Sequence, residues 1–251
     1  MENSKPWADR PFELVPSPKF KGFTDDRHWT ANEMAVSHNI YIRGINAIYL
    51  QAEHVSEPQD IRDFILFCRI WIEILDHHHQ VEEKIFFPMM EELTGVKGLM
   101  APNVEQHHAF HDGLAAFTEY ISSATPETYD GKALKKHVDS FAAALVQHLH
   151  DEIPTLMELH EHDRDGSISK KAYIAFENEL VSQSGKTRHR PFILGLRDVS
   201  FEEGANASWP PGVPFFIPYA LSALFSKTSG VWRFLPSDFH GRKRPLAFVS
   251  G

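Results

Sequence analysis

The sequence predicts an all-α protein: an antiparallel, up-down-up-down four-helix bundle followed by a loop-rich, aromatic C-terminal extension. Four long segments carry apolar residues at spacings of three and four, which is the period of a helix with one buried face. Short connections containing Pro or Gly separate them, and short connections favour antiparallel neighbours. We place the four helices at about residues 26–55, 59–93, 103–124 and 130–161.

These limits divide the chain into three parts. Residues 1–25 form an N-terminal arm, residues 26–162 the bundle and residues 163–251 the extension. The extension begins with a short helix near residues 169–180 and then becomes dense in Pro, Gly and aromatic residues. This composition is too apolar for a solvated coil. We therefore expect the extension to pack on the bundle, either as a structural cap or as a lid over a site.

Two prolines fall inside predicted helices, Pro88 in the second and Pro154 in the fourth. Proline has no backbone N–H and its ring crowds the preceding turn. Each is expected to kink or loosen its helix at that point.

Composition excludes several classes of protein. A formal net charge of −9 gives no general attraction to nucleic acid. No apolar run reaches the roughly 20 residues that a membrane-spanning helix needs. The single cysteine, Cys68, cannot form an intrachain disulfide, and the N-terminus lacks the pattern of a secretory signal. We expect a cytoplasmic protein with neither a nucleic-acid partner nor a membrane span.

Histidine stands out, because 14 of the 16 histidines lie between His28 and His162. Residues that share a helix face recur every three or four positions, so a buried metal ligand must share the phase of the apolar stripe. The fourth segment has such a stripe, which runs through Leu134, Val138, Phe141, Leu145, His148 and Glu152. The last two side chains are therefore predicted to point into the core.

The other segments repeat this pattern. In the second, His78 and Glu82 follow the apolar stripe; in the third, His107 and His111 do so, and in the first, His38. Five imidazoles and two carboxylates in a core would cost several kcal/mol each, on the order of the whole stability of a domain, if nothing balanced their charge. Metal cations provide that balance. Seven ligands without a thiolate cluster indicate two ions, and imidazole with carboxylate suits iron, with manganese and zinc not excluded.

At this point the sequence resembles a known family. Histidine on the first helix is followed by His78-x-x-x-Glu82, His107-x-x-x-His111 and His148-x-x-x-Glu152, an order similar to that of the hemerythrin or HHE cation-binding family over about residues 26–160. The resemblance implies two non-haem irons joined by an oxo or hydroxo group. It assigns the protein ligands as follows: His107, His111 and His148 on one iron, His38 and His78 on the other, and Glu82 and Glu152 on both. One iron then has five donors and a position for dioxygen, peroxide or nitric oxide.

The sequence departs from the oxygen-carrying branch of that family at one position. That branch has an aspartate five residues after the histidine of the fourth helix, where this chain has Ile153. Glu152, one residue earlier, takes its place. This difference bears on the expectation of oxygen transport and not on that of the di-iron site.

The register of the second segment is open to a slip of one residue. His79 and Glu83 have the same spacing as His78 and Glu82, and we prefer the latter pair because it keeps the phase of Leu75. The remaining neighbours are expected to form hydrogen bonds behind the ligands or to face solvent: His77, His79, Glu83 and His108.

Three functions are compatible with such a site. The first is binding of dioxygen or another small diatomic ligand by a carrier or sensor. The second is a di-iron oxidase, oxygenase or peroxidase that acts on a small organic substrate beneath the extension, since loops over a rigid scaffold often recognise substrates. The third is iron storage or sequestration. Two carboxylates are few hard oxygen donors for high-valent iron, which favours binding over oxygenation.

Overall fold

The computed structural model describes residues 6–185, 187–225 and 230–249, and within these ranges the regular structure is helical with no strand. The all-α prediction is confirmed. The α-helices are α1 (Trp29–Gln51), α2 (Pro58–Val81), α3 (Phe87–Thr94), α4 (Ala101–Ser123), α5 (Gly131–Glu158), α6 (Ser167–Gln183), α7 (His189–Leu196) and α8 (Ile217–Leu224). The predicted short helix corresponds to α6, whereas α7 and α8 lie in the part of the extension that was predicted to be loops.

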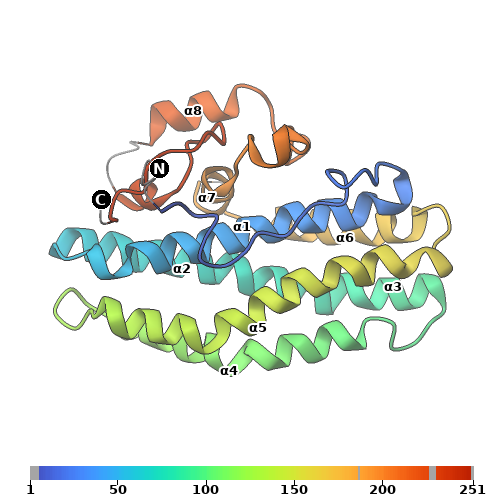
Figure 1. Cartoon of the computed structure of the whole chain (residues 1–251), viewed down its shortest axis with the longest axis horizontal. Coiled ribbons are helices and arrows are strands. Elements are labelled where there is room, and N and C mark those ends of the chain that lie inside the picture. The colour runs from blue at the N-terminus through green and yellow to red at the C-terminus, as the bar shows by residue number, and fades with distance from the viewer. Residues whose placement is uncertain (1–5, 186, 226–229, 250–251) are drawn as a thin grey trace, which may run out of the picture.

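Four long helical rods lie side by side: α1, α2 continued by α3, α4, and α5 (Figure 1). Helices α4 and α5 form one layer beneath α1 and α2, and apolar side chains from all four fill the space between them. Gly44 on α1 lets the Trp71 ring of α2 approach closely, since a Cβ at Gly44 would lie 2.2 Å from that ring. The Trp71 indole N–H donates to the Tyr41 carbonyl at 3.0 Å, which fixes α2 against α1.

The second rod is not a regular α-helix. Residues Glu82–Phe86 form a π-helical segment between α2 and α3, and the Phe87 N–H donates to the Glu82 carbonyl five residues back. Pro88 follows at once and has no N–H to donate into the preceding turn, so the predicted irregularity lies here. The extra residue shifts the helix phase, so that Phe86, Phe87 and Met90 are buried beyond this point.

Pro154 has a milder effect than Pro88. Helix α5 continues through it to Glu158 without a break. Its side chain is exposed, so the ring faces solvent instead of a neighbouring helix.

Helix α1 is buried on nearly every side because the N-terminal arm crosses its outer face. The Asn39 side chain accepts from the Val15 N–H at 2.8 Å and donates to the Val15 carbonyl at 2.9 Å. Asn46 makes the same kind of contact with Phe12, accepting at 2.9 Å and donating at 2.9 Å. Two buried asparagines thus satisfy the backbone of an arm that has no strand partner.

The extension covers the bundle in two places. Helix α6 lies along the end of α2 and the π-helical segment, where the Phe176 ring is 5.3 Å from that of His78. The later part covers the first half of α2: the Phe234 ring lies 5.0 Å from that of Phe64, and the Phe192 ring 4.8 Å from that of Phe67. The α6 region is thus the part of the extension that touches the histidine-rich end of the bundle.

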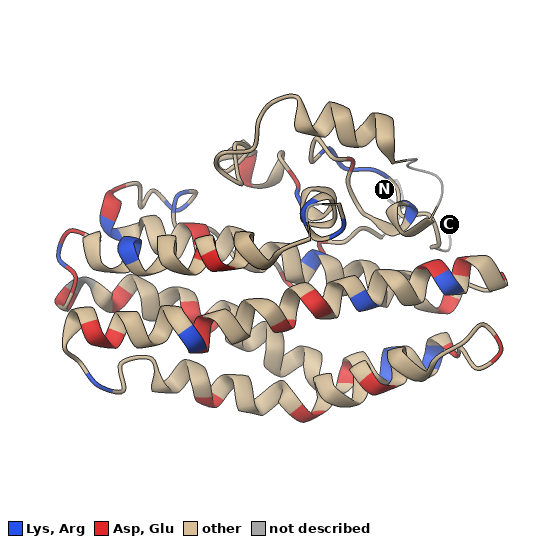
Figure 2. Ribbon diagram, turned by 180° about the vertical axis from the view of Figure 1, so that it is seen from behind, with Lys and Arg blue, Asp and Glu red and all other residues tan. Residues whose placement is uncertain are grey.

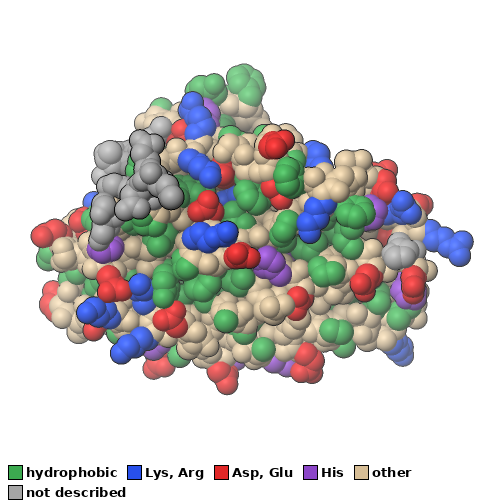
Figure 3. Space-filling model, in the orientation of Figure 1, with side chains coloured by type: hydrophobic (Ala, Val, Ile, Leu, Met, Phe, Trp, Pro, Cys, Tyr) green, Lys and Arg blue, Asp and Glu red, His purple; other side chains and the backbone are tan. Residues whose placement is uncertain are grey.

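Along the helix ribbons, Lys and Arg residues are interspersed with Asp and Glu residues (Figure 2). Hydrophobic side chains are exposed where α8 lies, at the top of Figure 3, and Phe215 is the most exposed of them at 84%. No helix within the described residues is long and apolar enough to cross a membrane.

Candidate metal centre

Seven ionisable side chains from all four rods meet in the interior of the bundle. Each is no more than 7% exposed: His38 of α1, His78 and His79 of α2, Glu82 of the π-helical segment, His107 of α4, and His148 and Glu152 of α5. The apolar stripe of α5 explains two of them, since His148 and Glu152 follow Leu145 on the buried face. The cluster holds five imidazoles and two carboxylates.

These side chains form two overlapping groups. In one, single donor atoms of His79, Glu82, His107 and His148 all lie within 4.8 Å of one another; in the other, those of His38, His78 and Glu82 do. Glu82 belongs to both groups. Glu152 lies beside the second group, with Oε2 3.1 Å from His38 Nε2.

The donor atoms approach one another as ligands of a common ion would. His78 Nε2 lies 2.9 Å from Glu82 Oε1, and His107 Nε2 lies 3.6 Å from Glu82 Oε2. With metal–ligand bonds of about 2.1 Å, two ligands at right angles are roughly 3 Å apart. The spacing therefore suits a shared coordination sphere.

Most donor atoms of the cluster lack hydrogen bonds, although buried polar groups in folded proteins nearly always have them. Within the cluster, the atoms without a hydrogen-bond partner among the described residues are His38 Nε2, both ring nitrogens of His78, His79 Nε2, and all four carboxylate oxygens of Glu82 and Glu152. Such a concentration of unsatisfied donors and acceptors in one place fits a metal-binding protein, because cations would satisfy the carboxylate oxygens and one nitrogen of each ring.

In three of the imidazoles, the Nδ1 atom, which points away from the centre of the cluster, forms a hydrogen bond. His38 Nδ1 donates to the Leu149 carbonyl at 2.6 Å, so its Nε2 carries the free lone pair. His107 Nδ1 donates to Glu83 Oε1 at 2.7 Å, and His148 Nδ1 donates to Gln106 Oε1 at 3.2 Å. Contacts of this kind orient metal-binding histidines in known sites.

One consequence concerns the pair His107 and His148. With both Nδ1 atoms protonated, the two neutral rings direct unprotonated Nε2 atoms at each other across 3.1 Å. Two facing lone pairs repel unless a cation lies between or beside them. This pair is therefore the clearest single indication of a metal position.

The pKa values of the clustered side chains also fit a metal-binding site. Burial, followed by the neighbouring imidazoles, lowers the pKa values of His78, His79 and His148 well below 6.5. Burial and then the Glu152 carboxylate raise the pKa of Glu82 well above 4.5. The imidazoles are thus kept neutral, as metal ligation requires. The Glu82 carboxylate has no positive charge beside it to favour its ionised form, and a bound cation would supply that charge.

The structure corrects the sequence prediction for His111. Its side chain is 75% exposed and its Nδ1 lies 3.0 Å from the Asp112 carboxylate, outside the cluster. The buried face of α4 runs through Asn103, His107, Phe110, Leu114, Phe117 and Ile121. Phe110 occupies the core position that the prediction gave to His111. The aromatic residues at 110 and 117, in phase with His107, were the signal in the sequence.

His79 takes the place left by His111 in the seven-residue cluster. The sequence analysis treated His78 and His79 as alternatives, whereas the structure buries both. They lie four and three residues before Glu82, so both flank the face on which Glu82 lies. The sequence motif His-His-x-x-Glu, here His78, His79 and Glu82, therefore predicts that both histidines point into the core. The alternative partner Glu83 is 45% exposed and bonds to His107 from outside.

The other neighbours remain outside the cluster. His108 is exposed on α4. His77 is partly buried on α2, where burial lowers its pKa, and it belongs to neither donor group.

Comparisons with known proteins identify a family. Residues 31–159 match the family model described as the hemerythrin HHE cation binding domain. The chain is also 34% identical over 250 residues to the dimeric xanthone biosynthesis cluster protein R11 of Cryptosporiopsis sp. (strain 8999), a match that covers 98% of this chain and 94% of the relative. No solved structure matches significantly.

Proposed function

Because the chain belongs to the hemerythrin HHE cation-binding family, we propose that its buried cluster holds two iron ions and binds dioxygen or a similarly small ligand. The observation that carries this proposal is the pair of donor groups that share Glu82. A carboxylate with two oxygens, common to two sets of imidazoles, is the arrangement expected of a residue that bridges two ions.

The ligands divide as follows in this proposal. His79, His107 and His148 would hold one ion, and His38 and His78 would hold the other. Glu82 would contribute a carboxylate oxygen to each group, and Glu152 would complete the His38 side. When bound, a pair of irons would supply the two electrons needed to reduce dioxygen to the level of peroxide. The donor set of imidazole and carboxylate suits iron.

The surrounding residues orient the ligands and exclude water. The Leu149 carbonyl and the Glu83 carboxylate fix the rings of His38 and His107, and Phe176 of α6 covers His78. Because all seven side chains are nearly inaccessible, a diatomic molecule can reach them by small fluctuations, whereas an organic substrate needs a larger opening. Burial therefore favours a small ligand.

A second candidate function is oxidation of a small organic compound, and two observations favour it. The relative's name refers to xanthone biosynthesis. In addition, a row of aromatic contacts runs from the His78 ring to the start of α1: Phe176 at 5.3 Å, then Tyr173 at 5.5 Å, then Trp29 at 5.4 Å.

A hollow of about 310 Å³ lies at the end of this row. Trp29, Trp209 and Phe23 line it, together with polar groups that include Glu33. Ligand sites typically combine an apolar lining with a few polar groups. A phenolic compound bound here would lie next to the aromatic row and not at the metal ligands.

Mixing the chemically reduced, iron-loaded protein with dioxygen under a spectrometer tests the proposal. A coloured adduct that persists and is lost on deoxygenation supports reversible binding. Rapid conversion to the ferric state, accelerated by a xanthone-type phenol and slowed by Trp29→Ala, supports the oxidase. Failure of the reduced protein to react with dioxygen or nitric oxide would contradict both functions.

A further inference from the structure

The extension carries an apolar surface at α8, which lies outside the four rods of the bundle (Figure 1). Residues 205–226 of the sequence contain no charged residue. The most exposed large apolar side chains among the described residues belong to this segment: Phe215 at 84%, Leu224 at 69% and Tyr219 at 65%. Hydrophobic side chains gather at the top of the molecule, where α8 lies (Figure 3). Exposed apolar surface concentrated in this way marks an interaction site.

Helix α8 is apolar on both of its sides. On the inner side, Ile217 and Leu221 pack against the core, and the ring of Phe225, which ends the helix, lies 4.6 Å from that of Trp232. No residue of α8 is fully buried. A helix that is apolar all round is normally buried on every side. The outer side of α8 is therefore a surface that a partner would cover.

A positively charged turn lies beside this helix. Residues 238–243 form the turn, in which the Gly241 N–H donates to the Asp238 carbonyl at 2.8 Å. The His240 ring of the turn contacts the Tyr219 ring of α8, with the two centroids 4.6 Å apart. The next two side chains are open to solvent, Arg242 at 66% exposure and Lys243 at 45%. The turn thus places two exposed cations close to the apolar helix.

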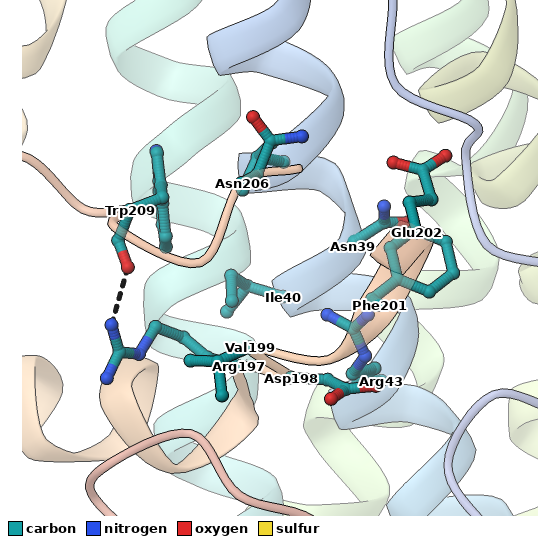
Figure 4. A pocket seen from close by; sticks show the side chains of 11 residues that line it. Asn39, Ile40, Arg43, Arg197, Asp198, Val199, Phe201, Glu202, Asn206 and Trp209 are labelled. Atoms are coloured by element: carbon teal, nitrogen blue, oxygen red, sulfur yellow. Dashed lines mark hydrogen bonds between the residues drawn. The ribbon is translucent and has the colours of Figure 1, made fainter. Parts of the chain in front are cut away.

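Arg197 holds the helix segment and the turn in place. Its guanidinium donates to the Trp209 carbonyl, which lies shortly before the exposed segment that begins at Val213 (Figure 4). It also donates to the Phe239 carbonyl, next to His240 in the turn, at 3.3 Å. Two parts of the chain that are 30 residues apart in sequence are therefore fixed by one side chain, and the surface has a defined shape.

The charge of this part of the chain differs from that of the rest. From Gly204 to Gly251 the sequence has five basic residues and one acidic residue, Asp238, whose side chain is only 12% exposed. The whole chain, in contrast, has a formal net charge of −9. An apolar face with a positive border complements an anionic lipid surface, because aromatic and aliphatic side chains enter the boundary between headgroups and acyl chains while basic side chains attract the headgroups.

We propose that α8 and the turn at residues 238–243 bind the surface of a membrane that contains anionic lipids. Phe215 and Leu224 enter the outermost part of the apolar layer, and Arg242 and Lys243 lie among the phosphates. The protein rests on the membrane and does not cross it. A second copy of this chain is a poorer occupant of the face, since it would bring an identical positive turn to it. This inference does not depend on the metal centre.

Flotation of the metal-loaded full chain with lipid vesicles tests the proposal. At low salt, vesicles that contain phosphatidylserine should bind the protein at least about fivefold more tightly than vesicles of phosphatidylcholine alone, because the exposed basic side chains act only on the former. Raising the ionic strength should reduce this difference, since salt screens exposed charges.

Phe215→Ser combined with Phe216→Ser should weaken vesicle binding at least about tenfold, because both apolar anchors are lost. Ile174→Ser combined with Val181→Ser is the matched control on α6, where these side chains are 44% and 47% exposed, and it should leave binding unchanged. Arg242→Gln should weaken binding to phosphatidylserine vesicles about fivefold and leave binding to phosphatidylcholine vesicles unchanged.

A fluorescent reporter at Leu224 gives a second measurement, which serves also if the double phenylalanine variant does not fold. Leu224→Cys can be labelled selectively, because the native Cys68 is fully buried. An environment-sensitive dye on Leu224→Cys should brighten and shift to the blue when phosphatidylserine vesicles are added, whereas the same dye on Val181→Cys should not. Absence of flotation with both kinds of vesicle, or equal flotation of the phenylalanine variant and its control, would overturn the proposal. A dye signal that follows protein concentration instead of lipid would also overturn it and would assign the face to a second copy.

Discussion

His79 of α2 and His107 of α4 face each other in the core with ring centroids 4.5 Å apart. His111, one turn further along α4, points into solvent. The contact shows which faces of α2 and α4 meet at the cluster. The cluster therefore has five imidazoles with His79 as the fifth, whereas the sequence prediction had five with His111 as the fifth.

Two alanine variants distinguish these sets. His79→Ala should lose at least half of the bound metal, because it removes a donor from the group that contains His107 and His148. His111→Ala should keep full metal content, since its side chain is exposed. Metal analysis of the two variants, purified side by side, measures this. The opposite order would restore His111 as the ligand and place α4 in the other phase.

Glu83 should support metal binding without being a ligand. Its carboxylate accepts the Nδ1 proton of His107 at 2.7 Å, which orients that ring and raises its basicity. Glu83→Ala should weaken metal affinity by about 10–100-fold. Glu92→Ala, an exposed change on α3, is the control. Competition with a chelator measures the affinity, and equal values for the two variants would show that the contact is incidental.

The metal-free protein should lose stability as the pH falls below about 6.5. In the folded state the pKa values of His78, His79 and His148 lie below that of an unfolded histidine, so the unfolded chain binds more protons in this range. Glu82 acts in the opposite direction, because its raised pKa favours the folded state at low pH. Three imidazoles outweigh one carboxyl. Thermal unfolding of the metal-free protein between pH 5 and 8 measures the slope, and a flat profile would contradict the burial of neutral imidazoles.

Phe176 should be important for stability as well as for covering the site. It is 1% exposed and packs against His78 and Phe86. Phe176→Ala should cost about 3–5 kcal/mol. Phe215→Ala, at a side chain 84% exposed, should change stability by less than about 0.5 kcal/mol. Urea unfolding of both variants gives the comparison, and a loss of less than 1 kcal/mol for Phe176→Ala would mean that α6 is only loosely attached.

Periodicity predicted the helices because each rod buries one face. The stripe of α5 is unambiguous, since every third or fourth residue from Leu134 to Leu145 is apolar, and the structure buries His148 and Glu152 in continuation of it. The stripe of α4 was less clear. The prediction placed His111 on the buried face with His107, whereas the structure buries the neighbouring residue Phe110 there.

Two features could not be predicted from periodicity. The π-helical segment inserts a residue into the second rod, so Phe86 and not Ile85 enters the core beyond Glu82. The outer face of α1 is buried because the arm and the extension cover it, and these contacts join residues far apart in sequence, such as Asn39 and Val15.

Metal analysis of the purified chain is the most direct test of the central claim that the cluster holds two irons. Elemental quantification combined with Mössbauer spectroscopy of iron-57-loaded protein should give close to two irons per chain, in a coupled pair. A single tightly bound zinc, or one isolated iron that does not couple to a second, would contradict the account.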